Sequence, residues 1–292
     1  MPKWLRWGAT AIFLVVVACA LEGPLFPWSP VKPGYTHFTL HRADIYYPSG
    51  TALEEAYRQV DTFIAEAETF HRLKMPDRIA VISPRTWTDF HLQAPWQRGP
   101  VGALTLQTGT VIFITPKVAE KHFDIAEYLR HELSHAIIDQ NSTLWRGHKM
   151  NRQPWLFEGL AVDFGRQKSY LSEDEFISRA KTEPLAPVFS GNDSDMRFNY
   201  VAWRYFMEHM IHTRGRDKFQ DYLLRVMQDP DRARPMFPVC FGVSFDAAIL
   251  EFQARVRDPR EIPSLYVAAG TLVYTLLHSR GSVSERRQSW RG

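Results

Sequence analysis

The spacing of apolar residues predicts a region of strands and helices followed by a mainly helical region. Residues 37–47 alternate between apolar and polar side chains and are rich in β-formers, which predicts a strand or hairpin. A short strand is expected at 78–82, and β-rich segments at 101–107 and 110–115 flank Thr108-Gly109 and predict a second hairpin. Apolar residues at a helical period predict helices at 51–70, 120–140, 153–165, 172–181, 197–212, 216–227 and 244–256.

The order of these elements predicts the fold class. A chain of 292 residues can form one large domain or two small ones. Because the strands come first and helices dominate afterwards, we predict a single α+β domain over residues 35–258. It should contain a small, mostly antiparallel sheet with one candidate active-site helix at 120–140, followed by a mainly helical C-terminal subdomain.

The N-terminal segment has the pattern of a signal peptide or a membrane anchor. Lys3 and Arg6 precede an uncharged, mostly apolar run over residues 7–21. Three outcomes remain open: cleavage at the small-residue site Ala18-Cys19-Ala20, lipidation of Cys19 in a sequence like a bacterial lipobox, or retention of the run as an anchor. Residues 1–34 are therefore assigned as a signal peptide or anchor followed by a Pro-rich spacer.

The spacer interpretation rests on four prolines at every third position, namely Pro24, Pro27, Pro30 and Pro33. Proline favours the polyproline II helix, which has three residues per turn, so this segment could lift a domain away from a membrane. The alternative is an irregular arm that packs against the domain.

The C-terminal segment, 259–292, combines an apolar stretch with a basic tail. Residues 262–279 are uncharged and would reach about 27 Å as a helix, so they suit either a second membrane helix or a packed or interfacial helix. Because basic residues flank both apolar runs, the positive-inside rule places both ends in the cytoplasm and the domain outside. We therefore expect a membrane-anchored cell-envelope protein, with a lipoprotein or a secreted protein as alternatives.

Charge and cysteine content exclude several classes of function. The formal net charge is +3, of which residues 1–22 carry +1 and residues 279–292 carry +3, so the rest of the chain stands at −1. A nucleic-acid-binding protein needs clustered Lys and Arg, so no nucleic-acid partner is expected. Two cysteines exclude a disulfide framework and a Cys-rich zinc module.

The candidate chemistry lies in His131-Glu132-Leu133-Ser134-His135, inside the helix predicted at 120–140. Residues i and i+4 share one face of a helix, so both imidazoles can reach one metal ion. Glu132 is offset by one position and can take a proton from water beside that ion. This is the His-Glu-x-x-His arrangement of zinc hydrolases, although a polar stripe on an ordinary helix has the same letters.

A third protein ligand would leave one position of a zinc ion open to water. Glu158 interrupts an apolar stretch, 154–161, at the start of the next predicted helix. A carboxylate in such a place is costly to bury unless it is paired or binds a metal. The alternative is an exposed first-turn glutamate that the helix dipole favours.

His131-Glu132-Leu133-Ser134-His135 followed by Trp-Leu-x-Glu-Gly-x-Ala at 155–161 resembles the gluzincin branch of zinc metallopeptidases, the thermolysin-like clan. Within that clan, it resembles the peptidase MA-like domains of the bacterial cell envelope. The resemblance covers residues 38–256 and implies a zincin-like fold, a small loop insertion around 141–151, Zn²⁺ bound by His131, His135 and Glu158, and Glu132 as general base. It also implies Tyr200 as the group that stabilises the oxyanion, with His209 and His212 as rivals.

The resulting expectation is a zinc-dependent metallopeptidase that hydrolyses peptide bonds in a peptide or protein substrate. Asp139 and Asp163 could orient the ligand imidazoles as hydrogen-bond acceptors. The main alternative is a non-catalytic, membrane-anchored envelope scaffold or peptide-binding protein with a structural zinc site. A zinc hydrolase acting on a non-peptide bond is a third option.

Overall fold

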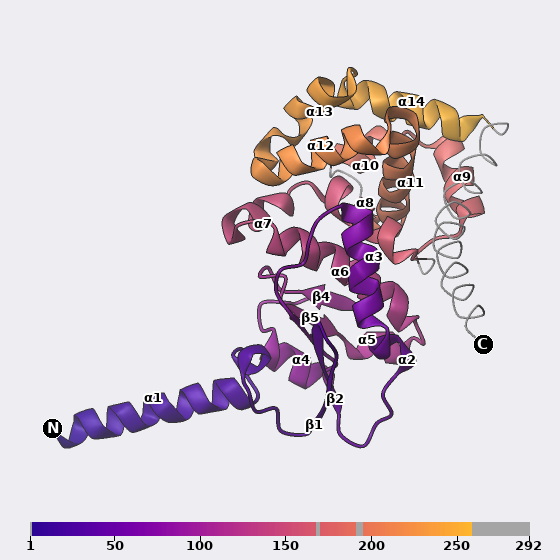
Figure 1. Ribbon diagram of the computed structural model, residues 1–292. Helices are drawn as coiled ribbons and strands as arrows, with labels where there is room; N and C mark the ends of the chain where they lie inside the picture. Colours follow the sequence, from indigo (N-terminus) through magenta and orange to yellow (C-terminus); the bar gives the residue numbers. More distant parts are fainter. Residues whose placement is uncertain (1, 168–169, 191–194, 259–292) are drawn as a thin grey trace, which may run out of the picture.

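The computed structural model describes residues 2–167, 170–190 and 195–258 (Figure 1). The apolar segment predicted at 262–279 lies outside the described residues. The described chain forms a five-stranded sheet with helices, followed by a mainly helical part, which confirms the α+β prediction. The strands are β1 (Tyr35–Thr39), β2 (Ala43–Pro48), β3 (Ile79–Ile82), β4 (Ala103–Thr105) and β5 (Val111–Ile114).

The sheet is mixed, with the strand order β1-β2-β3-β5-β4, where a mostly antiparallel sheet was expected. The outer pairs β1–β2 and β4–β5 are antiparallel hairpins, whereas the inner pairs β2–β3 and β3–β5 are parallel. Parallel pairing requires a crossover connection. The helices α2 (Glu55–Arg58) and α3 (Val60–His71) make the first crossover, and α4 (Trp87–Gln93) with β4 lies in the second.

Both faces of the sheet are covered, and strand β5 shows how. Its four residues are all buried, and successive side chains point to opposite faces. Ile112 and Ile114 belong to the main core with residues of α3 and α6 (Ile125–Gln140), whereas Val111 and Phe113 join a second core with Phe90 of α4. The β4–β5 turn also touches α6, because Gln140 donates a 2.7 Å hydrogen bond to the carbonyl of Gly109.

Most predicted helices are present, some with shifted ends. The helix expected at 51–70 is divided into α2 and α3, and the one expected at 120–140 begins only at Ile125 as α6, after a separate short helix, α5 (Pro116–Glu120). The later helices are α7 (Leu144–Met150), α8 (Pro154–Gly165), α9 (Glu173–Thr182), α10 (Ala186–Ser190), α11 (Met196–Arg214), α12 (Arg216–Gln228), α13 (Ala233–Phe241) and α14 (Phe245–Arg257). Helices α4, α5, α7, α10 and α13 were not predicted, and α7 occupies the place of the expected loop insertion.

Helix α8 lies at the centre of the helical part, where it packs against α6 on one side and α11 on the other. Its close approach to α11 depends on Gly159, since a Cβ atom there would lie 3.0 Å from the carbonyl oxygen of Trp203. Nine of its twelve residues are buried. This packing places the residue before Gly159, Glu158, against the helix that carries the two histidines.

Helix α1 (Lys3–Leu21) projects away from the domain, and none of its residues is buried (Figure 1). Its length and apolar character suit either a signal sequence or a membrane anchor. The following segment includes a short 3-10 helix, η1 (Phe26–Trp28), in which Phe26 and Pro27 are buried. Of the two interpretations of the Pro-rich segment, this burial favours the arm that packs against the domain.

Candidate metal centre

The two motif histidines project from consecutive turns of α6. This helix begins at an aspartate cap, where the Asp124 carboxylate accepts a 2.8 Å hydrogen bond from the backbone N–H of Ala126. The imidazoles of His131 and His135 are inclined at 76°, and their Nε2 atoms lie 3.1 Å apart. Two nitrogen lone-pair sites therefore face the same small volume.

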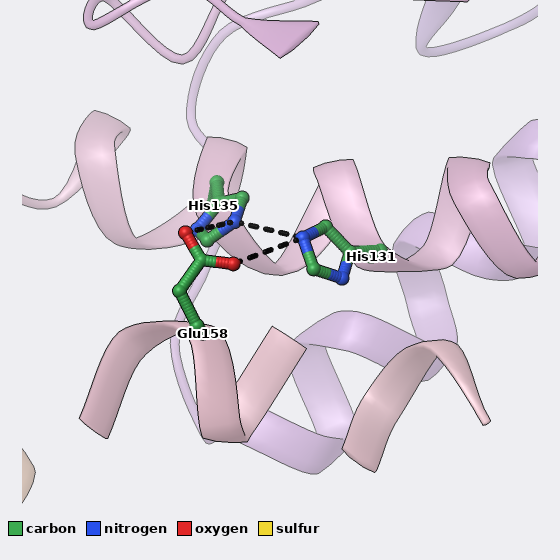
Figure 2. Close-up of side chains that lie close together, drawn as sticks. All are labelled: His131, His135 and Glu158. Atoms are coloured by element: carbon green, nitrogen blue, oxygen red, sulfur yellow. Dashed lines mark hydrogen bonds and ion pairs between the residues drawn. The ribbon is translucent and has the colours of Figure 1, made fainter. Parts of the chain in front are cut away.

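Glu158 reaches this volume from α8 (Figure 2). Its Oε2 lies 3.4 Å from Nε2 of His131, and its Oε1 lies 3.7 Å from Nε2 of His135. One donor atom from each of the three side chains can be chosen so that all lie within 4.8 Å of one another. The structure thus brings together the three residues that the sequence analysis singled out as metal ligands.

These separations fit a tetrahedral metal site. A zinc ion with bonds of about 2.0–2.1 Å needs neighbouring ligand atoms about 3.3–3.4 Å apart. The two imidazole nitrogens lie 3.1 Å apart, and each has a different oxygen of the Glu158 carboxylate close to this distance, Oε2 at 3.4 Å from His131 and Oε1 at 3.7 Å from His135. Two imidazole nitrogens and one carboxylate oxygen also form a common donor set for catalytic zinc. The residues present therefore fit a zinc ion with one position left for another ligand.

The electrostatics of the cluster favour a cation between the three side chains. Burial opposes the charged form of His135, but the neighbouring Glu158 carboxylate outweighs it and raises the pKa of His135 to about 9. Burial likewise opposes ionisation of Glu158, yet the two imidazoles hold the pKa of its carboxyl group well below the ordinary range. A carboxylate held ionised beside two imidazoles is what a divalent cation requires, with the metal taking the place of the proton.

Glu132 is held beside the cluster by a threonine from the sheet. The hydroxyl group of Thr105, at the end of β4, lies 2.6 Å from Oε2 of Glu132 and 3.0 Å from its backbone carbonyl. Glu132 is 5% exposed, and its charge contributes to raising the pKa of His135. The carboxylate expected to act as base therefore has a fixed orientation next to the candidate ligands.

Tyr200 lies at the same site, on α11. Burial raises the pKa of its phenol, and the negative charge of the nearby Glu158 carboxylate acts in the same direction. Its ring packs against Tyr170, with the ring centroids 4.8 Å apart. Burial also raises the pKa of Tyr170, with smaller contributions from Tyr128, Glu158 and Glu132. Two tyrosines thus border the cluster on the α11 side.

The other polar residues considered in the sequence have different surroundings. Asp163 lies in a buried network with Arg204 and Glu208, where burial and the Asp163 charge raise the pKa of Glu208 to about 8. His209 packs against Phe252 of α14, and His212 is exposed. Asp139 acts on His135 through its charge. Among the described residues, the buried Nδ1 of His131 has no hydrogen-bond partner.

Thr105 and Tyr170 were missed by the sequence analysis. Thr105 ends the segment Ala103-Leu104-Thr105, where a polar residue is unremarkable, and only the packing of β4 against α6 places it on Glu132. Tyr170 follows α8 in a loop that carries no local signal. Its proximity to Tyr200 depends on how the chain returns from α8 to α11.

The fold and site together define an α+β protein with a His131–His135–Glu158 group that could hold a metal ion, arranged as in the His-Glu-x-x-His…Glu zincin motif. No protein-family model matches the chain, and no curated protein matches its sequence.

Proposed function

We propose that this protein is a zinc-dependent metallopeptidase. The observation that carries the proposal is the convergence of His131, His135 and Glu158 from two helices, with the Glu132 carboxylate held beside them. Three protein donors leave one position for water or substrate, which is the arrangement of catalytic rather than structural zinc sites.

In peptide hydrolysis, Glu132 and Tyr200 would have different chemical roles. When bound, zinc supplies Lewis acidity that stabilises negative charge on the scissile carbonyl group. Glu132 accepts the proton of the attacking water and transfers it to the leaving amine nitrogen as the C–N bond breaks. Tyr200 donates a hydrogen bond to the oxygen that becomes negatively charged.

Strand β4 offers a place for the substrate backbone. It is the last strand of the sheet, so its outer edge can pair with an extended peptide, and Thr105 connects that strand to Glu132. Pairing through main-chain hydrogen bonds carries little sequence preference. This supports a peptide or protein substrate over a small molecule.

We further propose that α1 holds the domain on the outer side of a membrane in the cell envelope. None of the residues of this helix is buried, and it is long enough to span the hydrocarbon core. Lys3 and Arg6 at its N-terminal end favour a cytoplasmic N-terminus.

The test is a matched set of variants of the full chain, purified in detergent. The wild type should contain one zinc ion per chain and cleave an unfolded casein-type substrate in a chelator-sensitive way. Glu132→Gln should keep zinc and lose hydrolysis, and His131→Ala should lose both, whereas replacing the exposed His148 by Ala should change neither. Full activity of His131→Ala would overturn the proposal. Zinc binding without hydrolysis in the wild type would support the structural-site alternative instead.

A further inference from the structure

The junction between α1 and the domain is a short, hydrogen-bonded turn. The backbone N–H groups of Gly23 and Leu25 both donate to the carbonyl of Cys19, and that of Phe26 donates to the carbonyl of Gly23. Phe26 is only 1% exposed, so the chain enters the domain core within a few residues of the end of α1. A membrane entered by α1 would therefore lie directly against the domain.

The packing of the arm is reinforced by Lys32. Its ammonium group donates hydrogen bonds to the carbonyls of Phe26, Pro27 and Ser29, at 3.0, 3.2 and 2.6 Å. Burial lowers the pKa of Lys32 to about 8. The only basic side chain between residues 23 and 33 is thus turned toward the protein rather than toward solvent.

Exposed apolar side chains are concentrated next to this junction. Among the described residues outside α1, eleven large hydrophobic side chains are exposed, and five of them lie in the segments 23–31 and 90–97. Neither segment contains an Asp, Glu, Lys or Arg, although such residues make up 23% of the chain. These five side chains, here called the N-terminal apolar face, are Leu25, Trp28, Val31, Leu92 and Trp96.

The two segments lie side by side. Phe26 of η1 belongs to the same buried cluster as Phe90 and Ala94, which flank Leu92 at the end of α4. Tyr35, which follows the arm, contacts both segments. Its ring centroid lies 5.1 Å from that of Phe26 in the arm, and its hydroxyl group accepts a 3.3 Å hydrogen bond from Gln93 at the end of α4. Figure 1 shows α4 next to the end of α1.

We propose that the N-terminal apolar face lies in the interfacial region of the bilayer that α1 enters, so that the domain rests on the membrane surface. This inference rests on the proposed anchoring by α1. Tryptophan is enriched at this depth because its ring is apolar while its N–H group needs a polar partner, and Trp28 and Trp96 are 53% and 54% exposed. Because neither segment contains a charged residue, these side chains can reach the boundary between headgroups and acyl chains without burying a charge.

The experiment measures the depth of spin labels on the full chain in vesicles of phosphatidylethanolamine and phosphatidylglycerol. Single cysteines are introduced into a Cys19→Ser, Cys240→Ser background as Leu92→Cys, Trp96→Cys, Leu250→Cys and Ile12→Cys. Collision with oxygen, which concentrates in lipid, is compared with collision with a water-soluble nickel chelate. Leu250, which is 64% exposed on α14 at the far end of the domain, is the control for solvent exposure, and Ile12 reports insertion of α1.

The labels at positions 92 and 96 should give an oxygen-to-nickel ratio several-fold above that at position 250 and below that at position 12. Lipid exposure of the label at position 12 together with solvent exposure of the labels at 92 and 96 would overturn this proposal. The separate proposal that α1 anchors the protein in the membrane would then still hold. Solvent exposure at all four positions would overturn both. Protection of 92 and 96 from both reagents would show a protein partner on this face, such as a second copy, and would also overturn the proposal. Peptidase activity is measured separately, so its loss cannot be confused with these outcomes.

Discussion

The Oε2 atom of Glu158 lies 3.4 Å from the Nε2 atom of His131, although the two residues belong to different helices. The contact exists because α8 packs closely against α6, with Glu158 directed at the face that carries both histidines (Figure 2). A carboxylate in this position completes a three-donor site that two histidines on one helix cannot form alone.

Replacing that carboxylate should weaken metal binding far more than it weakens the fold. Glu158→Gln keeps the shape of the side chain but removes the negative charge. Replacing a residue that only hydrogen-bonds to a metal ligand weakens metal binding by up to about 100-fold, so replacing a ligand itself should raise the Kd for zinc by more than that. Competition with a chelating dye measures the change. Glu175→Gln, at an exposed position on α9, is the control and should bind zinc normally. Wild-type affinity in Glu158→Gln would remove this residue from the site.

The Thr105 hydroxyl should matter for turnover rather than for metal binding. A hydrogen bond to a charged group contributes about 1.5–3 kcal/mol, so Thr105→Val should lower kcat by about 10- to 100-fold while zinc content stays the same. Thr105→Ser keeps the hydroxyl group and should restore most of the activity. Equal losses in the Val and Ser variants would point to packing of the methyl group instead of orientation of Glu132.

Loss of the Tyr200 hydroxyl should also reduce turnover. If it stabilises the oxyanion, Tyr200→Phe should lower kcat by about 10²–10³-fold with little change in KM, because the contact forms only in the transition state. Tyr170→Phe removes the neighbouring hydroxyl and serves as the comparison. A large loss in Tyr170→Phe with near-normal kcat in Tyr200→Phe would transfer the role to Tyr170.

A partly buried ion pair between Arg42 and Glu68 predicts that part of the stability depends on pH. Burial of Glu68 opposes its ionisation, but hydrogen bonds from Arg42, the backbone of Met75 and Lys74 outweigh it and lower the pKa of Glu68 to about 2, against an ordinary value of 4.5. The stabilisation from this interaction is therefore fully present above pH 4.5 and is lost as the pH falls toward 2.

Glu68→Gln should show this dependence in urea unfolding. It should lower the free energy of unfolding at pH 7, and the difference from the wild type should shrink as the pH falls below 4.5. Glu55→Gln, whose side chain is 72% exposed, is the control and should have little effect at any pH. A deficit in Glu68→Gln that stays constant from pH 7 to pH 3 would contradict the assigned pKa.

Local patterns in the sequence determined the elements and part of the site. His131 and His135 share a helix face because their spacing matches one helical turn, and this geometry holds wherever the helix packs. The same reasoning applies to α8, α9, α11, α12 and α14, whose apolar residues repeat at the helical period. The α+β class followed from the order of such segments along the chain.

The tertiary structure decided every relationship between separate elements. Glu158 could have been an exposed first-turn residue, and only the packing of α8 between α6 and α11 directs it at the histidines. Thr105 and Tyr170 joined the site in the same way, and the parallel pairing of β2, β3 and β5 depended on crossover helices. Phe26 is likewise buried, so the Pro-rich segment packs against the domain, which its proline spacing alone did not decide. Such contacts arise from the free energy of packing the whole core, which no short window of sequence contains.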